Sequence, residues 1–211
     1  MKILFIRHGQ STGNVSGRFT GQTDVKLTEL GITQSQILCD YILKNYKIDK
    51  IYSSFLSRAI DTVKPLTQSL NLDIICDTKL NELSVGDWEN MLISDINKDY
   101  PEEIKKWESG DVYAKCPNGE NFYEVYHRAV SFLTEILNGD NSTVVISSHG
   151  GVIRSLLCFI KYGSVEKLKD VSWGSNASIT EVHYKDKKFS LIREFYDEFL
   201  GDLTSTYVKT V

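Results

Sequence analysis

The sequence predicts an α/β fold: a three-layer αβα sandwich with a mostly parallel central sheet, helices on both faces and an insertion over one rim of the sheet. Short apolar runs alternate with longer segments of helical spacing, an order typical of parallel sheets covered on both sides. The composition is that of an ordinary globular protein, with 41% hydrophobic and 25% charged residues. We therefore expect one domain over residues 1–211, with a lid or insertion around residues 86–120.

The first half of the chain alternates strand and helix. Residues 3–6 are a short apolar run, which indicates a buried strand, and residues 28–46 have apolar side chains at helical spacing. Residues 51–53 are a second short apolar run, and residues 56–70 again have helical spacing. Pro65 lies inside this second helix and should kink it, because its nitrogen cannot donate to the carbonyl one turn earlier.

The middle of the chain is less regular. Residues 73–76 indicate a third strand, but between residues 82 and 119 the periodicity loosens and aromatic residues and prolines are scattered among charges. We expect this stretch to lie over one end of the sheet. Helical spacing returns over residues 121–137, and Gly139 is a suitable stop for that helix.

The last third of the chain predicts the remaining elements. Residues 144–147 form a fourth apolar strand, and residues 151–160 form the helix that follows it. Residues 178–184 and 189–194 are separated by a short lysine-rich turn and indicate a late hairpin. Residues 201–211 carry no clear pattern.

Charge and cysteine usage limit the partners and the location. A net charge of −4 gives no basic footprint for nucleic acid or for an anionic membrane, so neither is expected as a partner. No run approaches a membrane span, and the apolar start at residues 3–6 is too short for a signal peptide. The cysteines are widely spaced without a C-x-x-C pair, which favours free thiols and a cytoplasmic location. They are Cys39, Cys76, Cys116 and Cys158.

Two strands end in the same dipeptide. Residues 3–6 run into Arg7, His8 and Gly9, and the strand at residues 144–147 runs into His149 and Gly150. Because ligands bind at the carboxyl ends of strands in open α/β sheets, both histidines are expected at one rim. A glycine after each histidine permits close backbone approach and leaves N–H groups for an anion.

Charged residues are expected at the same rim. Arg7 is adjacent to His8, and Arg58 opens the helix after the second strand; guanidinium matches phosphate oxygens in a bidentate fork. A carboxyl group just after the third strand could protonate a leaving oxygen. From spacing alone Glu82, Asp87 and Glu89 are equivalent candidates.

The motifs together resemble the histidine phosphatase superfamily, also called phosphoglycerate-mutase-like. They occur in family order between residues 3 and 154. The matching segments are Arg7-His8-Gly9-Gln10-Ser11-Thr12-Gly13-Asn14, Phe19-Thr20-Gly21-Gln22-Thr23-Asp24, Tyr52-Ser53-Ser54 with Ser57-Arg58-Ala59, Leu80-Asn81-Glu82 with Gly86-Asp87-Trp88-Glu89, Pro117-Asn118-Gly119-Glu120, and Ser147-Ser148-His149-Gly150-Gly151 with Arg154.

The resemblance implies a role for each matched residue. His8 would be the nucleophile that becomes a phosphohistidine, and Glu82 would be the proton donor. The phosphate pocket would be formed by a larger set: Arg7, Arg58 and His149, with Asn14, Thr20, Gly21 and Gly150 lining it. No cofactor and no metal are expected, because arginine and imidazole supply the positive charge.

The resemblance leaves three functions to compare. The favoured one is a metal-independent phosphatase acting on a small-molecule phosphomonoester, because residues 86–119 contain lysines and no arginine to hold a second acidic group. The alternatives are a cofactor-dependent phosphoglycerate mutase and an inactive phosphate-binding or interaction module. Departures at Gln10, Gln22 and Asn121 leave the substrate open, and the assembly is open between monomer and homodimer.

Overall fold

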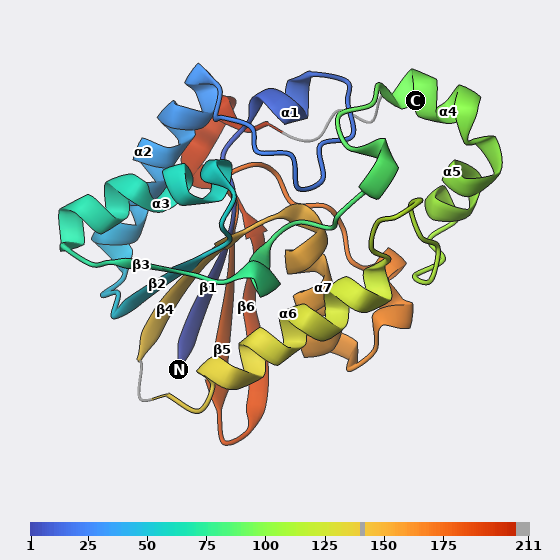
Figure 1. Ribbon diagram of the computed structural model, residues 1–211. Helices are drawn as coiled ribbons and strands as arrows, with labels where there is room; N and C mark the ends of the chain where they lie inside the picture. The colour runs from blue at the N-terminus through green and yellow to red at the C-terminus, as the bar shows by residue number, and fades with distance from the viewer. Residues whose placement is uncertain (140–141, 206–211) are drawn as a thin grey trace.

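The computed structural model describes residues 1–139 and 142–205, and a six-stranded mixed sheet lies at its centre (Figure 1). The strand order is β3-β2-β4-β1-β5-β6. The four strands from β3 to β1 are parallel, whereas β5 is antiparallel to β1 and β6 is antiparallel to β5. The strands are β1 Lys2–Arg7, β2 Lys50–Ser53, β3 Ile74–Cys76, β4 Thr143–Ser148, β5 Ile179–Lys185 and β6 Lys188–Tyr196.

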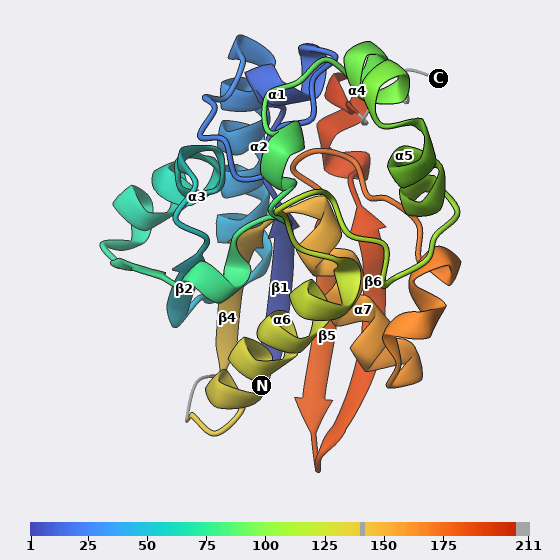
Figure 2. The same cartoon turned by 45° about the vertical axis from the view of Figure 1, so that its right-hand side comes forward.

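Two pairs of helices cover the sheet, one on each face (Figure 2), which confirms the three-layer prediction. One face carries α2 (Glu29–Asn45) and α3 (Ser57–Leu70), and the other carries α6 (Phe122–Ile136) and α7 (Gly150–Tyr162). Strand β1 serves both cores, because successive side chains of a strand point to opposite faces. Leu4 packs toward α2 and α3, whereas Phe5 packs toward α6 and α7.

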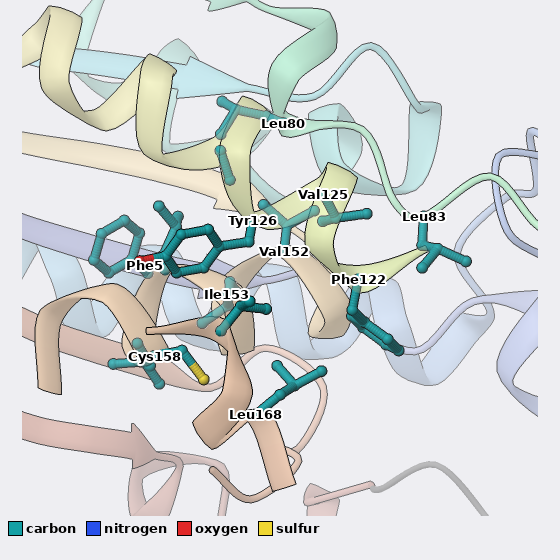
Figure 3. Packing of buried hydrophobic residues seen from close by; sticks show 14 of the residues in the cluster. Phe5, Leu80, Leu83, Phe122, Val125, Tyr126, Val152, Ile153, Cys158 and Leu168 are labelled. Atoms are coloured by element: carbon teal, nitrogen blue, oxygen red, sulfur yellow. The ribbon is translucent and has the colours of Figure 1, made fainter. Parts of the chain in front are cut away.

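The core between α6, α7 and the sheet is the larger of the two (Figure 3). Phe5, Val125 and Val152 are fully buried there, and Tyr126 and Ile153 lie against them. Since β1 and β4 are covered on both faces, their sequences read as continuous apolar runs. This is why periodicity located both strands to within a residue or two.

Helix α3 continues through Pro65 without a break. The carbonyl of Asp61, which Pro65 cannot satisfy, accepts a hydrogen bond of 3.2 Å from Ser35 Oγ on α2. The same hydroxyl also lies 2.8 Å from the carbonyl of Thr62. A neighbouring helix thus supplies the missing donor.

The late hairpin is confirmed, and its turn is tight. Lys185 pairs with Lys188, so only Asp186 and Lys187 form the loop. Both have positive φ, 52° and 61°, as a two-residue turn between twisted strands requires.

Residues 77–120 contain regular structure that periodicity did not reveal. Helices α4 (Ile93–Asp99) and α5 (Pro101–Glu108) lie toward the end of the sheet at which β1 terminates (Figures 1 and 2). Trp107 packs on Phe19, with ring centroids 5.3 Å apart. The shorter elements are α1 Thr12–Val15 and the 3₁₀ turns η1 Thr78–Leu80, η2 Gly86–Trp88, η3 Val165–Asp170 and η4 Glu198–Leu203.

Three further sequence predictions concern the surface and the thiols. All four cysteines are free, as expected. Within residues 1–139 and 142–205, no helix has the length and apolar character needed to cross a membrane. Of the patternless stretch 201–211, residues 206–211 lie outside the described part of the chain.

Candidate active site

The two histidines lie side by side where β1 and β4 end. The strands are parallel neighbours with Arg7 opposite Ser148, and the N–H of His8 donates to the Ser148 carbonyl at 3.0 Å. The imidazole centroids of His8 and His149 are 5.1 Å apart, and the rings are tilted by 58°. Both side chains are buried. The sequence prediction that one rim gathers both histidines is therefore correct.

The backbone fixes the tautomer of His8. Its Nδ1 lies 2.7 Å from the carbonyl oxygen of Gly9, which can only accept, so Nδ1 carries the proton. The lone pair is then on Nε2. Burial lowers the pKa of His8 well below its ordinary value, and the charges of Arg58 and Arg7 lower it further. His8 is consequently a neutral imidazole with a free lone pair at neutral pH.

His149 is oriented by a serine at the end of β2. Its Nε2 lies 2.7 Å from Ser54 Oγ, which already accepts from the N–H of Leu56 at 3.1 Å. The hydroxyl proton of Ser54 is therefore available to Nε2, and the imidazole N–H falls on Nδ1. Among the described residues Nδ1 has no hydrogen-bond partner, although it is buried. Burial, then the charge of Arg58, lowers the pKa of His149 well below its ordinary value.

Arg58 is a buried cation at the start of α3. Its Nη2 donates to the carbonyl of Gly21 at 2.7 Å, and its Nη1 donates to the carbonyl of Thr23 at 3.0 Å. Gly21 has φ = +46°, a conformation that suits glycine and turns its carbonyl toward the guanidinium. Burial lowers the pKa of Arg58, while nearby carboxylates led by Glu82 raise it.

Glu82 reaches the same rim from the loop after β3. Its Oε1 accepts from the N–H of Leu83 at 2.9 Å, and its Oε2 accepts from the N–H of Gly151 at 3.2 Å. A Cβ on Gly151 would lie 2.5 Å from Oε1, so glycine is required for this approach. Gly151 is two residues from His149. The carboxyl therefore lies beside the first turn of α7.

The loop that carries Glu82 is held by Arg128 of α6. Nη1 of Arg128 donates to the carbonyl of Lys79 at 2.7 Å, and Nη2 donates to the carbonyl of Glu82 at 3.0 Å. The same guanidinium makes a two-point ion pair with Glu120, whose Oε2 also accepts from the N–H of Ser84 at 2.9 Å. Both Arg128 and Glu120 thus fix the backbone on either side of Glu82.

The structure separates Glu82 from its two sequence alternatives. Asp87 accepts from Asn118 Nδ2, at 3.1 and 3.0 Å. Glu89 accepts from the backbone N–H groups of Gln22 (2.8 Å), Thr23 (2.9 Å) and Val85 (3.2 Å). Glu89 therefore anchors the loop that supplies the Gly21 carbonyl to Arg58.

Two further predicted lining residues, Asn14 and Thr20, make contacts within the segment that follows β1. Asn14 Oδ1 accepts from the N–H of Ser11 at 2.9 Å and from Asn176 Nδ2 at 3.2 Å. Thr20 packs against Gly13, where a Cβ would collide with its side chain. None of these contacts involves the rings of His8 or His149.

One side of the site was missed by sequence reasoning. Asn176 Nδ2 donates to the carbonyl of His8 at 3.1 Å, and the N–H of Ala177 donates to the same oxygen at 3.2 Å. Arg7 Nη1 donates to the carbonyl of Gly174. A Cβ on Gly150 would lie 2.9 Å from the indole of Trp173. Residues 173–177 lie between η3 and β5 and show no helical or strand periodicity. The sequence motifs end at residue 154, so neither periodicity nor motifs could assign this segment to the site.

The assembled groups suit one kind of chemistry. The neutral imidazole of His8 lies next to that of His149, the charges of Arg58 and Arg7 act on it, and the Glu82 carboxyl group lies beside the first turn of α7. Such fixed positive charge stabilises a phosphoryl group in transfer, because its charge spreads over the equatorial oxygens. Within the described ranges 1–139 and 142–205, no three His, Cys, Asp or Glu side chains gather as metal ligands would.

Comparison with known proteins identifies the family. Residues 3–196 match the sequence profile of the histidine phosphatase superfamily, branch 1. The chain belongs to this superfamily. Membership confirms the resemblance drawn from the motifs and extends it past residue 154 to include the segment 173–177.

Relatives within the histidine phosphatase superfamily carry different names. Phosphoserine phosphatase 1 of Hydrogenobacter thermophilus is 30% identical over 208 residues, covering 94% of this chain and 97% of the relative. Phosphoglycerate mutase-like protein 4 of Arabidopsis thaliana is 32% identical over 160 residues, covering 74% and 69%. A structure of mycobacterial glucosyl-3-phosphoglycerate phosphatase with VO3 superposes with a TM-score of 0.82 at 29% identity, covering 90% of this chain and 96% of that one.

Proposed function

We propose that this protein is a phosphatase that hydrolyses small-molecule phosphomonoesters through a phosphohistidine on His8. The observation that carries the proposal is the His8 imidazole, whose Nδ1 is held by the Gly9 carbonyl so that the lone pair is on Nε2, and which is kept neutral by burial and by the charges of Arg58 and Arg7. An imidazole in this state is a nucleophile, and nearby cations match the charge of a phosphoryl group.

In the first step, Nε2 of His8 attacks phosphorus and the bond from phosphorus to the ester oxygen breaks. Glu82, in its acid form, gives its proton to that oxygen, which leaves as an alcohol. In the second step, the Glu82 carboxylate takes a proton from water, the water oxygen attacks phosphorus and the nitrogen–phosphorus bond breaks. Inorganic phosphate and neutral His8 result, so the cycle closes.

The remaining residues would hold the phosphoryl oxygens. Arg7 and Arg58 supply charge, and the Nδ1–H of His149 is a buried donor that can turn to an oxygen. The N–H of Gly150 at the start of α7 adds the positive end of the helix dipole, whereas the N–H of Gly151 is donated to Glu82. Asn14, Thr20 and Gly21 would line the pocket by fixing the loops around it.

Two observations favour a phosphatase over a mutase. Residues 86–119 contain no arginine that could hold a second acidic group while the phosphoryl moves. The phosphatase-named relative from Hydrogenobacter also covers more of this chain, 94% against 74% for the mutase-like protein. The relatives are named for different substrates, so similarity to them does not identify the organic group of this protein's substrate.

We also infer the organisation that surrounds this chemistry. One domain over residues 1–211 would carry residues 86–120 as its insertion, because α4 and α5 lie toward the end of the sheet with the histidines. Four free thiols favour a reducing cytoplasmic location. Size-exclusion chromatography distinguishes a monomer from a homodimer.

The test is a trapping experiment with a labelled substrate. Rapid acid-free quenching during turnover of a phosphorus-labelled aryl phosphate should leave label on His8, located by peptide mass spectrometry. His8→Ala should lose both label and turnover, while His183→Ala, in β5, should keep both. Turnover by a well-folded His8→Ala protein would refute the proposal. Activity that requires a bisphosphorylated primer would instead support the mutase.

A further inference from the structure

Trp173 is a half-exposed aromatic side chain at the edge of the candidate site. Its exposed fraction is 46%, whereas Trp88 is fully buried. A large indole left in water forgoes the free energy of burying it, which is about 25 cal/mol for each Å². The indole lies next to the predicted phosphate pocket, where its exposed surface can contact a substrate.

The indole lies beside the residues that would hold phosphate. A Cβ built on Gly150 would be 2.9 Å from Cζ3 and 3.0 Å from Cε3 of Trp173, and 3.7 Å from Nε of Arg7. The six-membered ring of Trp173 and the Arg7 guanidinium thus flank one point, directly after His149. The indole is therefore close enough to Arg7 to contact a group attached to a phosphate bound there.

Contacts hold both the ring of Trp173 and the residue that follows it. The guanidinium of Arg154 lies 4.1 Å from the ring centroid, and its Nε and Nη2 donate to the carbonyls of Val171 (2.9 Å) and Leu168 (2.8 Å). The carbonyl of the next residue, Gly174, accepts a hydrogen bond from Arg7. The indole is therefore held in place before a ligand arrives, which reduces the entropy lost on binding.

A second aromatic side chain, that of the buried Phe122, lies next to the following glycine. Phe122 lies 3.4 Å from the position of a Cβ on Gly151, the residue that approaches Glu82. Trp173 and Phe122 therefore line the first turn of α7 at Gly150 and Gly151. Of the charges near this surface, Arg154 already donates two of its N–H groups to carbonyls, so it is poorly suited to receive a carboxylate.

We propose that Trp173 is a specificity-determining wall of the substrate site, and that it selects phosphomonoesters whose organic group carries a planar or apolar ring close to the phosphate. The proposal rests on the phosphatase function proposed above. An aromatic ring stacked on or against the indole gains attraction beyond the area it buries, whereas a short polar chain gains little.

The test compares two substrates with alcohol leaving groups, benzyl phosphate and ethyl phosphate. In the unaltered protein kcat/KM should be higher for benzyl phosphate, and Trp173→Ala should lower the benzyl-to-ethyl ratio about 10-fold. Trp173→Phe should restore part of the ratio. Tyr162→Ala is the matched control: Tyr162 is 44% exposed and pairs with the cation of Lys161, but lies at the far end of α7, about 18 Å along the helix.

A binding measurement keeps the proposal testable should Trp173→Ala fail to fold. Benzylphosphonate, which cannot be hydrolysed, should bind the unaltered protein more tightly than methylphosphonate and change its tryptophan fluorescence. The fluorescence change should vanish in Trp173→Phe. A benzyl-to-ethyl ratio that is equal in all variants, or equal binding of the two phosphonates, overturns the proposal. Failure to hydrolyse either ester overturns the phosphatase function instead.

Discussion

Arg58 is fixed by the loop it faces before any substrate is present. Two of its N–H groups are held by the carbonyls of Gly21 and Thr23, so the direction of its remaining donors is set. Arg58→Ala should cost about 3–4 kcal/mol of transition-state stabilisation, the scale for one preorganised donor. Arg58→Lys should recover only part, because a point charge cannot replace the planar fork.

Steady-state kinetics on one aryl phosphate measure both Arg58 variants. Arg193→Ala, which removes a surface guanidinium bound to Tyr41, is the control. Full activity in Arg58→Lys would reduce the role of Arg58 to simple charge.

Glu82 should matter in proportion to how much the leaving oxygen needs a proton. An alkyl phosphate releases a poor leaving group, so Glu82→Gln should slow its hydrolysis by about 10²–10⁴-fold. A nitrophenyl phosphate releases a stabilised phenolate and should be affected far less. The measurement is kcat/KM for a series of phosphate esters, and the leaving-group slope is the dependence of log kcat/KM on the pKa of the alcohol released. Equal losses on both substrate types would indicate that Glu82 only positions other groups.

Glu89 is a matched comparison for Glu82, because it has the same charge and lies seven residues later in the chain. Its carboxylate holds the N–H groups of Gln22, Thr23 and Val85. Glu89→Gln should therefore lower kcat/KM for alkyl and nitrophenyl phosphates by a similar factor, through the loop that meets Arg58. A loss that depends on the leaving group would move the proton donor from Glu82 to Glu89.

At the scale of elements, α6 controls the loop after β3 through one side chain. Arg128 binds the carbonyls of Lys79 and Glu82 and pairs with Glu120. Arg128→Ala should leave the Lys79 carbonyl without this donor and the Glu82 carbonyl with only Gln22 Nε2, at 2.9 Å. Catalysis should fall, with a larger loss for alkyl than for nitrophenyl phosphates. Arg128→Lys should rescue little, since it cannot bridge two carbonyls and a carboxylate.

The readout for Arg128 is the leaving-group slope together with the melting temperature. Lys115→Ala, which breaks an exposed ion pair with Glu124 on the same helix, is the control. A loss of stability with an unchanged slope would make Arg128 purely structural.

The elements differ in how far the sequence could predict them. Strands β1 and β4 are buried on both faces, so their apolar runs and the histidines after them were located correctly. Helices α4 and α5 span only 7 and 8 residues, which is too short for a clear period. Trp173 and Asn176 lie in a segment without periodicity, and the chain must fold back before either approaches the residues after β1 and β4.

The identification of Glu82 as the proton donor shows a second limit of prediction from sequence. Spacing could not separate it from Asp87 and Glu89, because all three follow one strand within a few residues. What separates them is the partner of each carboxylate, and those partners come from Gly151, Asn118 and the loop at Gln22. Resemblance to the family, not periodicity, selected the residue that the structure brings to α7.

For the whole molecule, the two buried histidines make stability depend on pH. An imidazole in the unfolded chain gains a proton near pH 6.5, whereas His8 and His149 stay neutral because burial lowers both pKa values. The unfolded state then binds more protons, so stability is full above pH 6.5 and is lost as the pH falls toward the folded-state pKa values. Each histidine can contribute up to about 1.4 kcal/mol per pH unit.

Urea unfolding at pH 7.5 and 6.0 should therefore give a lower free energy of unfolding at pH 6.0. The doubly substituted protein His8→Asn/His149→Asn should show a smaller difference between the two conditions. His183→Asn, on the half-exposed side of β5, is the control. The same pH dependence with and without the two histidines would contradict the neutral buried pair.

The sheet order has a consequence for the order of synthesis. Strand β1 is made first, yet its neighbours in the sheet are β4 and β5, which follow it by more than a hundred residues. On the ribosome, a nascent chain that has reached β3 has no strand to pair with β1. Such distant pairing slows folding, because a long loop must close before any contact rewards it. The nucleophile is therefore translated among the first residues but gains its neighbouring strands and the imidazole of His149 only late, so incomplete translation products would carry His8 without the site around it.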